Sequence, residues 1–106
     1  MAKLELKGKV MFVGGVETVG KNDLKKQQII VTVPPYRDEF GDILGREENW
    51  QFSILGKKVE EFDFDDDMLL KKIHCKGFVN SNTVINEDGD EMYIIEAVLY
   101  SFEIIP

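Results

Sequence analysis

The stretch Trp50–Leu70, WQFSILGKKVEEFDFDDDMLL, passes from a strand pattern to a helix pattern at a single glycine. Its first residues alternate between large apolar and small or polar side chains, which is typical of a half-buried strand that ends at Gly56. After the glycine, Val59 and Phe62 recur at helical spacing. The aspartates at 65–67 are residues that cap or interrupt a helix. We therefore predict a strand and then a short helix.

Two strand patterns precede this stretch and two follow it. Alternation in residues 3–12 and the β-branched run in 25–33 predict the first two, and residues 72–80 and 92–105 predict the last two. A turn with Asp-Gly at its centre, residues 86–90, joins the last pair. Three strands, a helix and two strands is the order of a five-stranded Greek-key OB-fold barrel. We predict an all-β fold with one short helix between strands 3 and 4, and a single domain over residues 1–106.

Composition indicates a small soluble domain rather than a membrane protein. Apolar residues make up 43% and charged residues 31% of the chain, enough for one core and a solvated surface. No apolar run is long enough to span a bilayer, and no signal peptide is visible. The one cysteine, Cys75, cannot form an internal disulfide, so we expect a reducing, cytoplasmic location.

The sequence provides no basis for catalysis. His74 and Cys75 are single residues of their types, and neighbours on a strand point to opposite faces, so they cannot form a catalytic pair. One histidine and one cysteine are too few soft ligands for zinc. The acidic residues 63–67 lack the spacing of a calcium loop, and no phosphate-binding Gly-Lys-Ser/Thr loop occurs. We predict a protein that is not an enzyme, with no cofactor, no metal and no small-molecule substrate.

Charge is distributed unevenly along the 106 residues, whose formal net charge is −7. Residues 1–58 hold ten Lys/Arg and eight Asp/Glu, whereas residues 59–106 hold three and twelve. Binding of a polyanion depends on the local field rather than on the total charge. The first half can therefore carry a mildly basic face, while the second half repels phosphate.

Several short pieces of the chain, in their order, resemble the bacterial single-stranded DNA-binding protein family from about Lys25 onward. The pieces are Ile30-Val31-Thr32-Val33, Tyr36-Arg37-Asp38, Glu48-Asn49-Trp50, Leu55-Gly56-Lys57, Lys71 to Gly77, and Asp88 to Glu96. Short, poorly characterised bacterial proteins with the same barrel pattern resemble the chain equally well. The resemblance does not include the family's flexible acidic-tipped tail, so we expect a DNA-binding protein of this kind to recruit partners by another route or not at all.

The resemblance implies sequence-tolerant binding of single-stranded DNA, with bases stacked on aromatic rings and phosphates neutralised by Lys and Arg. By position, Tyr36 would be the stacking platform and Trp50 a second one. The residues that would follow the DNA backbone are Lys26, Arg37, Arg46 and Lys57.

Both aromatic residues also have a structural interpretation. Trp50 shares a strand face with Phe52 and Ile54, which favours the core unless a bulge near the start of the strand turns it outward. Tyr36 opens a polar loop, residues 36–48, where it is either a stacking platform or a ring packed over the barrel mouth. The lysines, taken singly, fit solvated ends of strands and helices.

Two functions of different classes remain open. The first is a single-stranded DNA-binding barrel, a homo-oligomer that acts in DNA replication or repair. The second is a protein-interaction or assembly module that kept the barrel without nucleic-acid binding, which the acidic second half favours. The two are distinguished by whether Tyr36, Arg37 and Lys57 converge on one concave face free of Asp63 to Asp67. We expect dimerisation to use the first strand.

Overall fold

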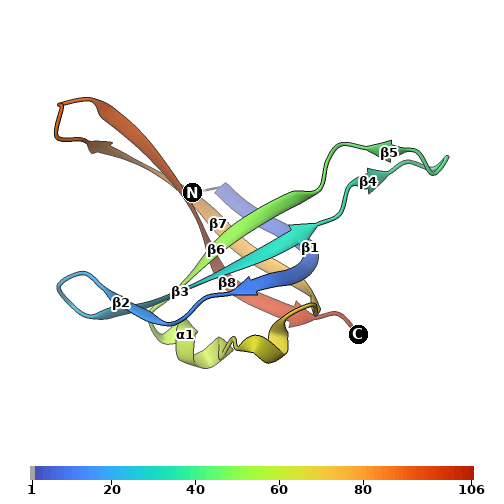
Figure 1. Cartoon of the computed structure of the whole chain (residues 1–106), viewed down its shortest axis with the longest axis horizontal. Helices are drawn as coiled ribbons and strands as arrows, with labels where there is room; N and C mark the ends of the chain where they lie inside the picture. The colour runs from blue at the N-terminus through green and yellow to red at the C-terminus, as the bar shows by residue number, and fades with distance from the viewer. Residues whose placement is uncertain (1) are drawn as a thin grey trace.

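Five long strands make up most of the computed structural model, which describes residues 2–106 (Figure 1). They are β1 (Ala2–Val13), β3 (Leu24–Val33), β6 (Glu48–Leu55), β7 (Lys72–Ile85) and β8 (Glu91–Ile104). Shorter strands lie between them, namely β2 (Glu17–Val19), β4 (Tyr36–Arg37) and β5 (Ile43–Leu44). The helical parts are α1 (Lys57–Phe62) and the 3-10 helix η1 (Asp66–Met68). The predicted order of long strands around one short helix is confirmed.

The long strands close into a barrel in the order β1-β7-β8-β6-β3, and β1 also pairs with β3 to complete the ring. These pairings are antiparallel except that of β6 with β8, which run parallel. β1 closes the ring by changing partner, because residues 2–9 pair with β7 and residues 9–13 with β3. This is the Greek-key topology of the OB-fold, so the predicted all-β fold class is confirmed.

Alternate residues of the strands face the barrel interior. Ile29 of β3 is in register with Phe52 of β6, and neither side chain has exposed surface. The other long strands contribute further fully buried side chains, including Val10, Ile73, Cys75 and Leu99. Burial of apolar surface, worth roughly 25 cal/mol per Å², is the main force that holds these strands together.

The segment after β6 closes one end of the barrel, and we term residues 57–68 the plug. α1 follows Gly56, whose φ is +63°, and buries Val59 in the core. Phe64 is buried after it, and the side chain of Asp65 then accepts the backbone N–H of Asp67 at 2.9 Å to begin η1. The capping role predicted for the aspartates is confirmed.

No helix in residues 2–106 is long and apolar enough to cross a membrane.

Gln27 is a buried polar residue that ties the plug to the strands. Its side chain is 3% exposed, and its Nε2 donates to the carbonyl oxygens of Gly14 at 2.9 Å and Phe64 at 3.0 Å. Both amide hydrogens are therefore bonded, as buried polar groups require. The periodicity of β3 places an inward side chain at this position, but it does not show that the side chain binds two loops.

Two glycines lie where strands approach too closely for a side chain. A Cβ atom on Gly8 would lie 2.5 Å from the carbonyl oxygen of Thr32, and one on Gly77 would lie 2.3 Å from that of Val98. Gly8 is next to the residue at which β1 changes partner, and Gly77 adjoins a register shift in the β7–β8 ladder. Barrel closure therefore requires glycine at both positions.

Besides the hairpin of β2 and β3, two further hairpins project from the barrel in different directions (Figure 1). We term residues 34–47 the β4–β5 arm; it forms a short ladder in the segment predicted as a polar loop. We term residues 80–95 the β7–β8 arm. It exists because β7 continues to Ile85 instead of ending near Asn80, and pairs with β8 as far as Glu91.

Candidate nucleic-acid interface

The tip of the β4–β5 arm is an ordered turn held by Asp38. One side-chain oxygen of Asp38 accepts the backbone N–H groups of Phe40 and Asp42, each at 2.9 Å. The guanidinium of Arg37 donates to the carbonyl oxygen of Gly41 across the tip at 3.3 Å. An aspartate that bonds to backbone groups just after it is a standard turn device. The carboxylate of Asp38 is thus engaged in the turn that presents Phe40.

Two aromatic side chains of this arm are exposed to solvent. Tyr36 is 69% exposed and Phe40 is 82% exposed. Exposed rings on a protruding arm provide surfaces on which unpaired bases can stack. Tyr36 is exposed, as the stacking role predicted from the sequence requires, and it is not packed over the barrel mouth. Sequence reasoning missed Phe40, although an aromatic between Glu39 and Gly41 in a turn-rich segment has no strand periodicity to explain it.

Both arginines of the predicted site lie on or beside this arm. Arg37 belongs to β4, and Arg46 lies between β5 and β6; both are exposed. Because successive strand residues alternate, Arg37 points to the opposite side of the arm from Tyr36. The structure therefore brings Tyr36, Arg37 and Arg46 to one arm.

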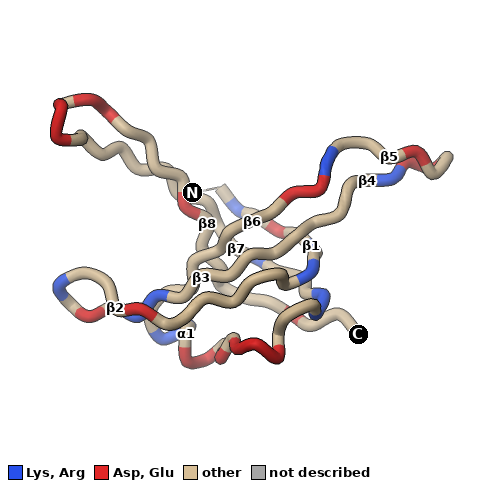
Figure 2. Tube along the Cα trace, in the orientation of Figure 1, with Lys and Arg blue, Asp and Glu red and all other residues tan. Residues whose placement is uncertain are grey.

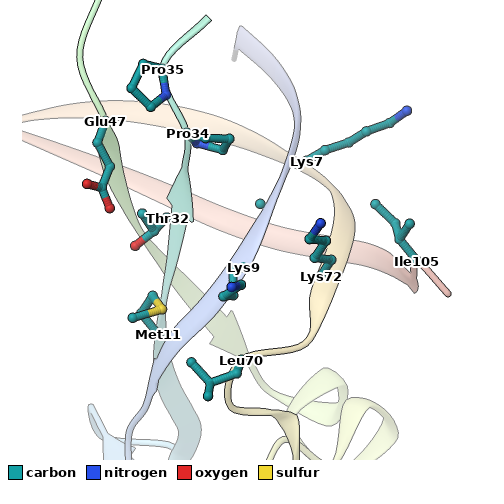
Figure 3. A pocket seen from close by; sticks show the side chains of 11 residues that line it. Lys7, Lys9, Met11, Thr32, Pro34, Pro35, Glu47, Leu70, Lys72 and Ile105 are labelled. Carbon is teal, nitrogen blue, oxygen red and sulfur yellow. The ribbon is translucent and has the colours of Figure 1, made fainter.

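At the base of the β4–β5 arm the barrel surface forms a hollow of about 720 Å³ (Figure 3). Lys7 and Lys9 of β1 and Lys72 of β7 stand around it, and we term it the basic hollow. Its lining is mostly apolar and includes Met11, Pro34, Pro35, Leu70 and Ile105.

The hollow lies where β1 leaves β7 and joins β3. Glu47 of the arm also lines the hollow, against the three lysines. A concave surface with an excess of lysine attracts phosphate. These lysines were missed because only barrel closure brings Lys72 beside Lys7 and Lys9.

Lys26 lies far from the arm. On β3, Val33 is seven positions after Lys26, a distance of roughly 23 Å at about 3.3 Å per residue, and the arm begins only after Val33. The Nζ atom of Lys26 is 3.1 Å from Oε2 of Glu96, so a phosphate would compete with that carboxylate. Lys26 is therefore separated from the cluster on the arm.

Lys57 lies on the acidic plug. It is the first residue of α1, and the carboxylates of the plug are those of Glu60, Glu61, Asp63, Asp65, Asp66 and Asp67. The pKa of Glu60 is lowered by its hydrogen bond and charge interaction with Lys25.

Tyr36, Arg37 and Lys57 do not converge on one face, an outcome that favours the assembly-module alternative.

Trp50 faces the barrel interior. It is in register with Val31, whose side chain is fully buried, and it packs half-buried against the core. Its indole N–H donates to Oε2 of Glu48 at 2.9 Å. The β3–β6 ladder runs from Lys26 to Val33 without the bulge that would turn the ring outward. The core interpretation of Trp50 is confirmed, and only part of the ring is accessible for stacking.

His74 and Cys75 point to opposite sides of β7, as predicted. The Cys75 thiol has no exposed surface, and burial raises its pKa from 9.0 to about 12, so it stays a protonated thiol rather than a nucleophile. His74 contacts the carboxylate of Glu5 on the outer face. Within residues 2–106, no group of three His, Cys, Asp or Glu side chains is placed to hold a metal ion.

Acidic segments of the second half of the chain gather in two places, the plug and the tip of the β7–β8 arm (Figure 2). The basic hollow is remote from the tip of the β7–β8 arm, because Lys72 and Ile85 lie at opposite ends of β7, but it adjoins the end of the plug at Leu70 (Figures 2 and 3). Three lysines and one carboxylate, that of Glu47, line the hollow, so its lining is opposite in sign to the net charge of the chain.

No family model matches this sequence, and no curated protein matches it. Solved structures do match. The mitochondrial single-stranded DNA-binding protein Rim1 of S. cerevisiae superposes with a TM-score of 0.67 at 8% identity, covering 98% of this chain and 94% of that one. A Plasmodium falciparum SSB, solved in complex with ssDNA, superposes with a TM-score of 0.62 at 14% identity, covering 100% and 96%. The chain thus has the SSB-like OB-fold; at these identities the likeness concerns the fold.

Proposed function

We propose that this protein binds single-stranded DNA with the β4–β5 arm and the basic hollow, without preference for sequence. One observation carries the proposal: two exposed aromatic side chains, Tyr36 and Phe40, project on an arm whose base adjoins three lysines. Bases stack on aromatic rings whatever their identity, and lysines neutralise phosphates. The SSB proteins that share the fold, one of them solved with ssDNA, support this assignment.

Arg46 and Arg37 serve as phosphate contacts on the arm, Arg37 from the side opposite Tyr36. A DNA strand that continues from the arm along the outer face of β3 reaches Lys26 and then Lys57. Both are weaker phosphate contacts, because Lys26 is paired with Glu96 and Lys57 lies on the acidic plug. Trp50 contributes only the accessible part of its ring. The role is protection of single strands in DNA replication or repair, with no catalytic step.

The experiment is a fluorescence-anisotropy titration of a labelled oligothymidylate of about 35 nucleotides, which spans several sites of roughly 4–16 nucleotides each. We expect binding that weakens steeply between low and moderate salt, because phosphate neutralisation releases counterions. Absence of binding even at low salt would overturn the proposal.

A homo-oligomer is part of the same proposal. In the described chain, residues 2–8 of β1 pair with β7 on one side only, so their other edge can pair with the same strand of a second copy. Sedimentation equilibrium measures the mass directly. A single-chain mass at every concentration would contradict the oligomer.

The assembly module stays as a second candidate because of the β7–β8 arm. Its large apolar side chains are exposed, among them Ile85, Tyr93 and Ile95, while its tip is acidic. A surface of this kind suits a protein partner rather than DNA. If oligothymidylate does not bind, this function takes precedence.

A further inference from the structure

The β7–β8 arm exposes apolar side chains on both of its faces. In the ladder, Thr83 is opposite Tyr93 and Ser81 is opposite Ile95, so Tyr93 and Ile95 share one face. They are 70% and 72% exposed. The opposite face carries Val84, Met92 and Ile94, all exposed as well. An isolated two-stranded hairpin is marginally stable in water, and this one leaves its apolar surface uncovered.

The tip of this arm is acidic and ordered. Asn86 holds the turn, since its side chain accepts the N–H of Asp90 at 2.9 Å and its carbonyl oxygen accepts that of Gly89 at 3.0 Å. Residues 77–106 contain no lysine or arginine. The carboxylates at or beside the tip are those of Glu87, Asp88, Asp90 and Glu91. A surface complementary to the arm therefore has an apolar floor and a basic rim.

The basic hollow has these properties. Its floor is apolar, and Lys7, Lys9 and Lys72 surround it. The arm cannot reach the hollow of its own chain, because Lys72 and Ile85 lie at opposite ends of β7. They are thirteen positions apart, which spans roughly 43 Å at about 3.3 Å per residue. An acidic arm in the hollow must come from another molecule.

We propose that the β7–β8 arm of one copy docks in the basic hollow of a second copy. Arm and hollow are different surfaces at opposite ends of β7, so the contact is head-to-tail and builds open chains or a ring. It differs from edge pairing of β1, which joins identical surfaces. The contact is small and charged, so the association is weak, dependent on concentration and reduced by salt.

Self-association through the arm does not require DNA binding. Under the proposed function, however, phosphates and the arm use the same lysines and exclude each other at any one hollow. The test is therefore made without DNA, so that its failure and the failure of the DNA titration are separate results.

The test is sedimentation velocity on the full chain over a concentration series at low and moderate salt. An arm variant carries Glu87→Lys, Asp88→Lys and Asp90→Lys, and a hollow variant carries Lys7→Glu, Lys9→Glu and Lys72→Glu. We expect each variant alone to associate at least about tenfold more weakly than the unaltered chain, because like charges then face each other. An equimolar mixture of the two should regain association, since each reversed surface meets its complement.

A matched control separates docking from the effect of net charge. It reverses three lysines away from the hollow, Lys21→Glu, Lys25→Glu and Lys58→Glu, and so has the same net charge as the hollow variant. Because its arm and its hollow are both intact, it should associate on its own about as well as the unaltered chain. Three results would overturn the proposal: no salt-sensitive, concentration-dependent association of the unaltered chain, an arm variant that associates as well as the unaltered chain, or a control that loses association to the same degree as the hollow variant.

Discussion

The two arms of the barrel differ in the chemistry of their exposed side chains. The β4–β5 arm presents Tyr36 and Phe40 with Arg37 and Arg46, and its base adjoins three lysines. The β7–β8 arm also exposes an aromatic, Tyr93, but between aliphatic neighbours and below an acidic tip. Exposure of an aromatic ring is therefore insufficient to identify a base-stacking site. The local charge separates the two arms, because carboxylates repel the phosphates that accompany every base.

The arms differ in anchoring as well. The β7–β8 arm is a direct continuation of two barrel strands, whereas the β4–β5 arm is joined to the barrel through Pro34 and Pro35 on one side and Gly45 on the other. The β7–β8 arm is therefore an extension of the barrel itself, whereas the β4–β5 arm is a separate hairpin. The following measurements test whether the β4–β5 arm binds nucleic acid and the β7–β8 arm binds protein.

Removal of the aromatic rings should have the largest effect. In Tyr36→Ala/Phe40→Ala, two stacking platforms are lost, each worth about 1–3 kcal/mol. Affinity for oligothymidylate should fall by roughly 30-fold or more, measured by anisotropy. The matched change Tyr93→Ala/Ile95→Ala on the other arm should leave affinity unchanged. Equal losses from both pairs would abolish the distinction between the arms.

Substitution at the root of the β7–β8 arm should destabilise the whole barrel. Gly77→Ala places a Cβ atom against the carbonyl oxygen of Val98, so a strand must shift, at a cost of about 1–3 kcal/mol in the free energy of unfolding. Urea denaturation measures this cost. Gly15→Ala, whose Cβ atom meets nothing within 4 Å, is the control and should change stability little. An unchanged midpoint for Gly77→Ala would show that the arm root is flexible.

The lysines of the basic hollow should determine part of the salt dependence of DNA binding. Lys9→Gln and Lys72→Gln should each reduce the slope of log affinity against log salt by about 0.7, the value for one phosphate contact on a single strand. Lys21→Gln, on the turn between β2 and β3, should leave the slope as it is. If all three slopes coincide, the phosphates follow another path.

The smallest expected effect is that of the buried Cys75 thiol on the pH dependence of stability. Its pKa is about 12 in the folded protein because of burial, against 9.0 ordinarily, so above about pH 9 only the unfolded chain loses this proton. The thiol then lowers the free energy of unfolding by up to about 1.4 kcal/mol per pH unit. Between pH 8 and 10, Cys75→Ala should lose less stability than the unaltered chain. Identical pH profiles would contradict the expected shift.

Sequence patterns located the strands of the core because apolar alternation reports burial directly. The assignment of Trp50 to the interior followed from its shared face with Phe52, and the structure bears it out. The extent of β7 could not be predicted, since Ser81, Asn82 and Thr83 lack an apolar pattern. They are strand residues because β8 supplies their hydrogen bonds.

The candidate site was predictable only in part. Tyr36, Arg37 and Arg46 are close in sequence, so a resemblance confined to one segment placed them on one arm. Lys26 and Lys57 were grouped with them by analogy, yet β3 and the plug hold them at the other end of the barrel. Lys57 lies among carboxylates there. The acidic residues that follow it in the sequence indicate this surrounding, but the family resemblance does not take them into account.

The sequence by itself determined the order of strands, the position of the helix and the uneven charge of the two halves, because these depend on residues near each other in the chain. Only the tertiary structure decided which charges meet. Barrel closure brings Lys72 to Lys7 and Lys9, about 65 residues away along the chain, and pairs Lys26 with Glu96. Electrostatic fields act through space, so a basic surface on an acidic chain can be found only after the strands are paired.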